Sequence, residues 1–257
     1  MKKNVLFIFC HQDDEMAVFN HIENSIKLNL NVFVLFLTSG SINKKIDKNK
    51  LYHRDLESLS VLKNLGVKNK NIKFIGRKLG INVYELHKNY LAAYKELSKQ
   101  INYIKGDIEI ITHSWEGGNT DHDSCYLLVK KLYINNDKIK SCFQFSLYHS
   151  KNMPFNFYKV LDPITENGKI IKYSININDK IRFIFLLFKY LSQKKVWLGL
   201  YPSIIIKIIM NKYGYLQIIN KSRIIKKPHY GKLWYEKRNF ISYLNFYKKS
   251  KFLLSNQ

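Results

Sequence analysis

The chain opens with an alternation of short apolar runs and amphipathic stretches. Residues 5–9 form an uninterrupted apolar run, residues 16–26 carry apolar side chains at helical spacing, and residues 32–37 form a second run. Strand-length runs that are apolar on both faces are typical of parallel strands covered by helices. The pattern therefore predicts a βαβ unit whose strand-end loops open at the same edge of a sheet.

The same alternation continues further along the chain. It predicts helices at residues 52–65, at 84–104 and after 120, and strands at 72–75, 108–112 and 141–147. These elements complete a sheet of about five strands. We therefore predict an α/β fold, namely a Rossmann-like, doubly wound, mostly parallel sheet with helices on both faces.

The pattern changes after Pro154. A short alternating run at residues 170–177 precedes a helix that Asn178 and Asp179 should open, and a second apolar stretch follows at 196–210. That stretch is too short to span a bilayer, which takes about 20 residues. We expect a buried helix or a cap over the active site; an interfacial helix resting on lipid, helped by nearby lysines, is the alternative.

Two regions follow from this organisation. We predict a main domain at residues 1–200 and a helical or irregular extension at residues 201–257. The extension is basic and aromatic-rich, with few clear periods, so a lid and a packed tail are both consistent with it.

Composition narrows the class of protein. The chain has 257 residues, 46% of them hydrophobic, and only three cysteines, which form no CxxC pair. An odd cysteine count argues against a disulfide framework and favours the cytoplasm, and we see no export signal. The net charge of +24 is carried almost entirely by lysine in a chain also rich in Ile and Asn. A solvated surface is therefore the expectation; nucleic acid is disfavoured, and peripheral membrane contact stays open.

An acidic cluster directly follows the first predicted strand. His11, Asp13, Asp14 and Glu15 lie together where the chain turns into a helix. Unpaired carboxylates so close repel one another, which favours a bound cation. The alternative is that the acids merely suit the positive end of a helix dipole.

A second polar cluster follows the strand at residues 108–112. It includes His113 and His122, and both clusters should meet at one crevice because both follow parallel strands. His11, Asp14 and His122 form a set that suits zinc with one position open to water, which leaves Asp13 free to act as a base. This spacing is not specific by itself.

Four short pieces, taken together, make the sequence similar to a known family, the PIG-L/LmbE zinc-dependent de-N-acetylases. Its usual His-Pro-Asp-Asp-Glu signature resembles His11-Gln12-Asp13-Asp14-Glu15, and its His-x-Asp-His loop resembles Asn119-Thr120-Asp121-His122. An Arg-x-x-Glu helix followed by Leu-Gly is matched by Arg54, Glu57, Leu65 and Gly66, and a later piece by Tyr190-Leu191-Ser192-Gln193.

The resemblance implies a site and a reaction. It implies that His11, Asp14 and His122 bind Zn²⁺ or another divalent metal, that Asp13 is the general base, and that Arg54 contacts substrate or orders the site. The implied reaction is hydrolysis of the N-acetyl group of an amino sugar on a glycan, nucleotide sugar, glycolipid or related conjugate. Lysines near the crevice would suit an anionic carrier.

Two positions depart from the family pattern. Gln12 replaces a proline, which should loosen the turn without moving the ligands, whereas Asn119 replaces a histidine and cannot shuttle a proton. Either Asp13 makes both proton transfers, or His113 substitutes, or the enzyme is slow. We assign no role to the other crevice candidates Tyr148, His149 and His229.

One alternative from another class stays open. A basic protein that binds anionic membrane or nucleic acid could retain the same motifs as a vestigial metal site. Such a protein would bind in a strongly salt-dependent way whether or not Asp13 is intact.

Overall fold

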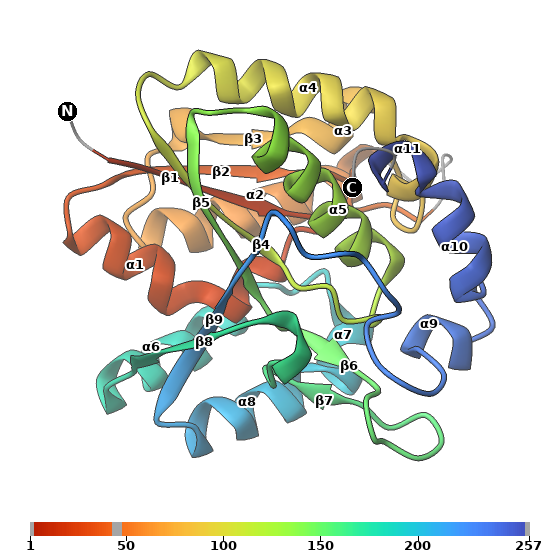
Figure 1. Ribbon diagram of the computed structural model, residues 1–257. Helices are drawn as coiled ribbons and strands as arrows, with labels where there is room; N and C mark the ends of the chain where they lie inside the picture. The colour runs from red at the N-terminus through yellow and green to blue at the C-terminus, as the bar shows by residue number, and fades with distance from the viewer. Residues whose placement is uncertain (1–2, 43–47, 255–257) are drawn as a thin grey trace.

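The computed structural model describes residues 3–42 and 48–254 (Figure 1). Its main sheet contains β1 Asn4–Phe9, β2 Asn31–Phe36, β3 Ile72–Phe74, β4 Ile108–His113, β5 Ile139–Phe145, β8 Ile170–Ser174 and β9 Tyr213–Ile218. The spatial order is β3-β2-β1-β4-β5-β9-β8. A separate antiparallel pair is formed by β6 Tyr148–His149 and β7 Lys159–Val160.

Helices connect and cover these strands. They are α1 Phe19–Lys27, α2 Lys48–Asn64, α3 Ile75–Leu79, α4 Tyr90–Tyr103, α5 Thr120–Asn135, α6 Ile177–Leu187, α7 Lys194–Gly199, α8 Tyr201–Met210, α9 Trp234–Lys237, α10 Tyr243–Lys249 and α11 Lys251–Leu254. A short 3-10 helix, Asp14–Val18, follows β1 and leads into α1.

Each face of the sheet has its own hydrophobic core. Side chains alternate along β1, so Leu6 and Ile8 join the core beneath α3, α4 and α5, while Val5, Phe7 and Phe9 join the core beneath α1, α2, α6 and α8. Because both faces are covered, the whole strand is buried. This explains why β1 reads as an uninterrupted apolar run, and it confirms the predicted fold class.

The predicted sheet of about five strands was too small. β1 to β5 are parallel, as predicted, but β9 pairs antiparallel with β5, and β8 pairs antiparallel with β9. β9 was missed because its sequence, Tyr-Gly-Tyr-Leu-Gln-Ile, has neither a continuous apolar run nor strict alternation.

The segment after residue 200 is packed into the same body. Besides β9, it contributes Tyr201 and Ile204 to one core and Phe246 to the other. The domain boundary that we predicted at residue 200 therefore coincides with no break in the packing.

The apolar stretch at residues 196–210 forms two helices. α7 ends at Gly199 and α8 begins at Tyr201, with Pro202 in its first turn, where a missing N–H costs no hydrogen bond. α8 buries one side and exposes Ile206, Ile209 and Met210 on the other. Within the described ranges, no helix is long and apolar enough to cross a membrane.

The strand order determines where a site can form. β1 lies between β2 and β4. The chain runs from β1 to β2 and β3 on one side of the sheet and then crosses to β4 and β5 on the other side. This reversal opens a crevice at the carboxyl ends of β1 and β4. His11 follows β1, and His113 is the last residue of β4. The two polar clusters therefore meet at this crevice.

Gly76, at the start of α3, permits a close approach to the end of β2. A β-carbon there would lie 2.2 Å from Thr38 Cα and 2.3 Å from the Leu37 carbonyl carbon, so backbone would have to move. We expect Gly76→Ala to lower the free energy of unfolding by about 1–3 kcal/mol in urea denaturation. Gly199→Ala is the matched control, because nothing lies within 4 Å of its β-carbon. Equal stability of the two variants would contradict this account.

Candidate active site

Three side chains from the two loops converge at the crevice. His122 Nε2 lies 3.2 Å from His11 Nδ1 and 3.3 Å from Asp14 Oδ1, and His11 Nδ1 lies 3.4 Å from Asp14 Oδ2. All three residues are buried. The structure thus brings together the ligand set expected from the sequence.

The spacing of these atoms fits a zinc ion. Zinc bonds to nitrogen and oxygen are about 2.0–2.2 Å, which puts neighbouring ligands of a tetrahedron roughly 3.3–3.6 Å apart. His122 Nε2 lies 3.2 Å from His11 Nδ1 and 3.3 Å from Asp14 Oδ1, which is close to that value, whereas the 3.4 Å contact of His11 Nδ1 is with the other oxygen of Asp14, Oδ2. Three protein ligands would leave a fourth position for water, as in catalytic rather than structural zinc sites.

The charges of the cluster also favour a cation. Burial lowers the pKa of His11, but Asp14 and Asp121 outweigh burial and raise it to about 10. Burial opposes ionisation of Asp14, yet His113, His122 and His11 hold its pKa well below the usual range. A proton and a metal ion would compete for this place, because a metal ligand must be deprotonated.

A second group of potential ligands, Cys10, Asp14 and His113, lies beside the first. Burial raises the pKa of the Cys10 thiol well above its usual range, and the thiol donates to the Asp121 carbonyl at 3.0 Å. Since the thiolate is the form that binds metals, this group is the weaker candidate.

Asp14 is held in place by donors that leave one of its oxygens free for the crevice. Its Oδ2 accepts from the backbone N–H of His11 at 2.6 Å and of Cys10 at 3.1 Å, and lies 3.0 Å from His113 Nε2. The His113 ring is fully buried, and burial lowers its pKa to about 3. The structure thus places His113 against Asp14, and its part in proton transfer stays a prediction.

Asp121 orients His11. Its Oδ2 lies 3.0 Å from His11 Nε2 and accepts from the Tyr84 N–H at 2.6 Å, while its Oδ1 accepts from the Leu86 N–H at 3.1 Å. A proton on Nε2 leaves Nδ1 of His11 as the atom that faces Asp14 and His122. Carboxylates that fix a ligand histidine in this way are usual at zinc sites.

Asp13 occupies an unusual backbone conformation next to the ligands. Its φ is 133°, a region that disfavours residues with a β-carbon, and its N–H donates to Glu15 Oε2 at 3.0 Å. Burial raises the pKa of the Asp13 carboxyl, against the opposing charge of Arg54. Glu15 therefore holds the peptide group of Asp13 in place, and the role of Asp13 as a base stays a prediction.

Arg54 joins the loops that follow β1 and β2. Its guanidinium donates to the carbonyls of Gly40 at 2.6 Å and Gln12 at 3.0 Å, and lies 3.5 Å from Asp13 Oδ1. The amide oxygen of Gln193 accepts from the same guanidinium. Arg54 thus orders the crevice.

Gln12 compensates for the missing proline of the turn. Its side-chain amide donates to Asp55 Oδ1 at 2.8 Å, which anchors the loop after β1 to α2. The turn is therefore held by a side-chain hydrogen bond rather than by a proline ring.

The side chain of Asn119 makes two hydrogen bonds within the described part of the chain, and neither requires a histidine. Its side-chain oxygen caps α5 by accepting from the Asp121 N–H at 2.8 Å, and its amide nitrogen donates to the Tyr148 hydroxyl at 3.2 Å. The Tyr148 ring packs against His122 with centroids 5.5 Å apart. The phenol of Tyr148 therefore lies beside the position at which the family has a proton-carrying side chain.

Comparison with known proteins agrees with this geometry. The family model PIG-L, described as GlcNAc-PI de-N-acetylase, matches residues 6–133, which run from β1 to α5. The chain belongs to the PIG-L family. It is accordingly an amide hydrolase of the de-N-acetylase type. No curated protein matched the chain.

Several solved structures share the fold of this PIG-L family member. The zinc-inhibited form of teicoplanin deacetylase Orf2 superposes with a TM-score of 0.61 at 12% identity, covering 84% of this chain and 97% of that one. The A40926 pseudoaglycone deacetylase Dbv21 gives 0.59 at 15% identity, covering 83% and 94%. N,N'-diacetylchitobiose deacetylase from Pyrococcus horikoshii gives 0.55 at 15% identity, covering 85% and 84%.

Sequence reasoning gave no role to two residues of this site. Asp121 was quoted only as part of a motif, although a carboxylate preceding a candidate ligand could have suggested an orienting partner. Tyr148 was named without a role, because its approach to Asn119 depends on the turn after β5. There, Glu116 Oε1 accepts from the Leu147 and Tyr148 N–H groups at 2.9 and 3.1 Å.

The orienting role of Asp121 can be tested by metal affinity. We expect Asp121→Asn to weaken zinc binding by about 10–100-fold, because the amide fixes the His11 ring less well than the carboxylate does. Competition with a chelating dye would measure this change, and Asp107→Asn, which alters an exposed carboxylate, is the control. Unchanged affinity in Asp121→Asn, with its fold intact by circular dichroism, would show that the contact does not support the metal.

Proposed function

We propose that this protein is a zinc-dependent hydrolase that removes the N-acetyl group from an amino sugar carried on a larger conjugate. The observation that carries the proposal is the set of His11, Asp14 and His122, whose nearest nitrogen and oxygen atoms lie 3.2–3.4 Å apart, with the buried carboxylate of Asp13 beside it, 3.5 Å from Arg54. Family membership supplies the reaction class. The similarity to an N,N'-diacetylchitobiose deacetylase supports an amino-sugar substrate.

His11, Asp14 and His122 would hold the metal. When bound, zinc supplies Lewis acidity toward an amide carbonyl and makes a nearby water more acidic. The protein's contribution is to fix these ligands. Asp121 sets the tautomer of His11, and the N–H groups at residues 10 and 11 set the orientation of Asp14.

Asp13 would act as the general base. It is not needed as a ligand, it is buried beside the ligands, and Glu15 holds its peptide in place. A carboxylate whose pKa is raised by burial accepts a proton from water more readily than an exposed one. Arg54, 3.5 Å away, would limit this rise and keep the carboxylate directed into the crevice.

Tyr148 would supply the hydrogen bond that Asn119 cannot supply alone. Burial raises the pKa of its phenol well above the usual range, so the hydroxyl stays protonated and able to donate. Asn119 Nδ2 donates to the phenol oxygen, which leaves the phenol proton for a developing oxyanion or for the leaving amine. Either hydrogen bond would replace the one expected from the family's histidine, and its donor would be a phenol instead of an imidazole.

The identity of the carrier belongs to the same proposal. A carrier with diphosphate or phospholipid groups would suit the excess of 43 basic over 19 acidic residues. A basic binding protein with a vestigial metal site has less support, because His11, Asp14 and His122 lie close enough together to hold a metal ion and Asp121 contacts His11 at 3.0 Å. Acetate release from N-acetylated sugars, with and without diphosphate carriers, distinguishes the two functions.

The role of Asp13 predicts a separation of chemistry from metal binding. We expect Asp13→Asn to lower kcat for acetate release by about 10²–10⁴-fold while the protein retains stoichiometric zinc, because the amide cannot accept the proton. Zinc content is measured by mass spectrometry on the same preparation. Asp107→Asn serves again as the control, and acetate release at the wild-type rate from Asp13→Asn would exclude Asp13 as the base.

The role of Tyr148 predicts a smaller loss. Tyr148→Phe keeps the ring against His122 and removes only the hydroxyl, so we expect kcat to fall about 10²–10³-fold with little change in KM or zinc content. Tyr158→Phe is a matched control, because its hydroxyl donates instead to the Gly199 carbonyl at 2.6 Å. Identical kcat in the two variants would mean that a group other than the Tyr148 hydroxyl supplies this hydrogen bond.

A further inference from the structure

Arg238, the residue directly after α9, is held by two aromatic rings. Its guanidinium carbon lies 5.9 Å from the centre of the Trp234 ring and 5.8 Å from the centre of the Phe240 ring. The side chain is exposed, and no carboxylate pairs with it within residues 3–42 and 48–254. Ring contacts of this kind restrict a side chain that otherwise has many rotamers, so the cation is fixed in place without being neutralised.

A series of ring contacts leads from Arg238 to the candidate ligand His122. Trp234 packs edge to face against Tyr158 with ring centroids 4.9 Å apart. Tyr148 in turn contacts both Tyr158, at 6.1 Å, and His122, at 5.5 Å. The segment around α9 therefore belongs to the wall of the crevice on the side of His122.

A second series of contacts leads from Arg238 to His11. Phe240 stacks on Tyr84 with ring centroids 5.0 Å apart. Tyr84 has a φ of 66°, and its N–H donates to the same oxygen of Asp121 that lies 3.0 Å from His11 Nε2. Arg238 is thus connected to both candidate histidine ligands, along two sides of the crevice.

The charges around the crevice act together on Tyr84. Burial raises the pKa of the Tyr84 phenol and Asp121 raises it further, whereas the positive charges of Arg238 and Arg54 oppose the rise. Burial and then Tyr84 raise the pKa of the Tyr148 phenol. Two guanidinium groups, one from α2 and one from the C-terminal segment, therefore act on the same part of the crevice.

These two guanidinium groups have different partners. Arg54 donates to two backbone carbonyls and lies 3.5 Å from Asp13 Oδ1, so it is already committed to the protein. The guanidinium of Arg238 contacts rings and no hydrogen-bond acceptor in the part of the chain that the structure describes. Its N–H groups can therefore serve an oxyanion that arrives with the substrate.

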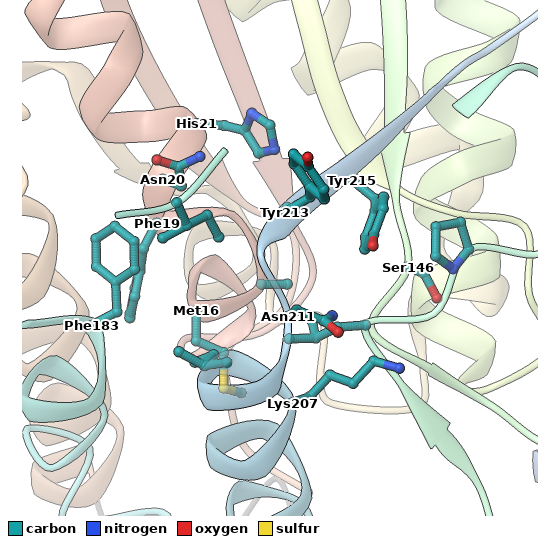
Figure 2. Close-up of a pocket in the computed structure, with 16 residues that line it drawn as sticks. Met16, Phe19, Asn20, His21, Ser146, Phe183, Lys207, Asn211, Tyr213 and Tyr215 are labelled. Atoms are coloured by element: carbon teal, nitrogen blue, oxygen red, sulfur yellow. The ribbon is translucent and has the colours of Figure 1, made fainter. Parts of the chain in front are cut away.

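The pocket shown in Figure 2 is a poorer place for an anion. It has a volume of about 50 Å³ and is lined mainly by apolar side chains, among them Met16 and Phe183. Lys207, the lysine in its wall, lies 3.9 Å from Asp162 Oδ1. A charged group of the substrate therefore fits better at Arg238.

We propose that Arg238 binds an oxyanion, a phosphate or a carboxylate, in the group that the substrate carries on its amino sugar, and so selects anionic substrates over neutral ones. Guanidinium groups bind both kinds of oxyanion through two parallel N–H bonds. This inference rests on the proposed de-N-acetylase function and adds to it a residue that determines substrate preference. Arg238 lies outside residues 6–133, which the family model matches, so the shared motifs do not account for this preference.

Kinetics with matched substrates test the assignment. The methyl glycoside of N-acetylglucosamine is neutral, whereas N-acetylglucosamine 1-phosphate and the carboxymethyl glycoside of the same sugar carry the two candidate anions. We expect Arg238→Gln to raise KM for the anionic substrates about tenfold or more, with kcat nearly unchanged, and to leave the neutral substrate unaffected. Arg238→Lys should restore only part of this loss, because an ammonium keeps the charge but not the planar fork. The larger of the two effects of Arg238→Gln identifies the preferred anion.

Binding of deacetylated sugars separates the assignment from the proposed reaction. Glucosamine 1-phosphate and methyl glucosaminide have no amide to hydrolyse, so calorimetric titration of the zinc-loaded protein measures their affinity without turnover. The affinity for the phosphate should fall about tenfold in Arg238→Gln and stay unchanged in Lys95→Gln, which removes a charge from an exposed position of α4, on another side of the molecule (Figure 1). If the wild type releases no acetate but shows this Arg238-dependent binding, the proposed function is wrong and the anion site stands.

Three results would overturn the assignment. The first is an Arg238→Gln variant with wild-type KM for both anionic substrates and wild-type affinity for glucosamine 1-phosphate. The second is an equal loss with neutral and anionic substrates, which would mean that Arg238 only holds the C-terminal segment against the crevice. The third is a wild-type protein that neither releases acetate nor binds the sugar phosphate, which would remove the proposed function as well. Circular dichroism and thermal unfolding establish that each variant is folded.

Discussion

The attraction between one buried carboxylate and the imidazoles around it is the interaction on which the rest of the site depends. Asp14 has His11, His113 and His122 within 3.4 Å and two backbone N–H groups on one oxygen. An ionised carboxylate away from water is costly unless it is paired. The strand order supplies the partners, because β1 and β4 deliver their end residues to the same crevice.

Much of this could be predicted from sequence because the signals were local. The apolar run at residues 5–9 and the polar residues that directly follow it are adjacent in the chain, so their relation does not depend on the rest of the fold. The contacts that sequence reasoning missed are all distant. Asp121 accepts from backbone N–H groups of Tyr84 and Leu86, and no side-chain pattern identifies a backbone donor.

At two positions this chain departs from the family pattern and makes different side-chain contacts within the same fold. Gln12 replaces the rigidity of a proline with a hydrogen bond to Asp55, and Asn119 keeps the helix cap while it directs the phenol of Tyr148. At both positions two side chains contact each other where the family pattern has a single proline or histidine. A pair is less tolerant of further change than a single side chain, because losing either member leaves the other without a partner.

The late position of β9 in the chain has a consequence for synthesis of the protein. β5 ends at Phe145, but its neighbour in the sheet, β9, begins only at Tyr213, and β8 has β9 as its only neighbour among the described strands. While the nascent chain is being made, β5 therefore presents an open strand edge until residues 213–218 have emerged. Open edges are where chains pair with one another wrongly. The antiparallel strand that completes the sheet thus also limits the time during which aggregation can compete with folding.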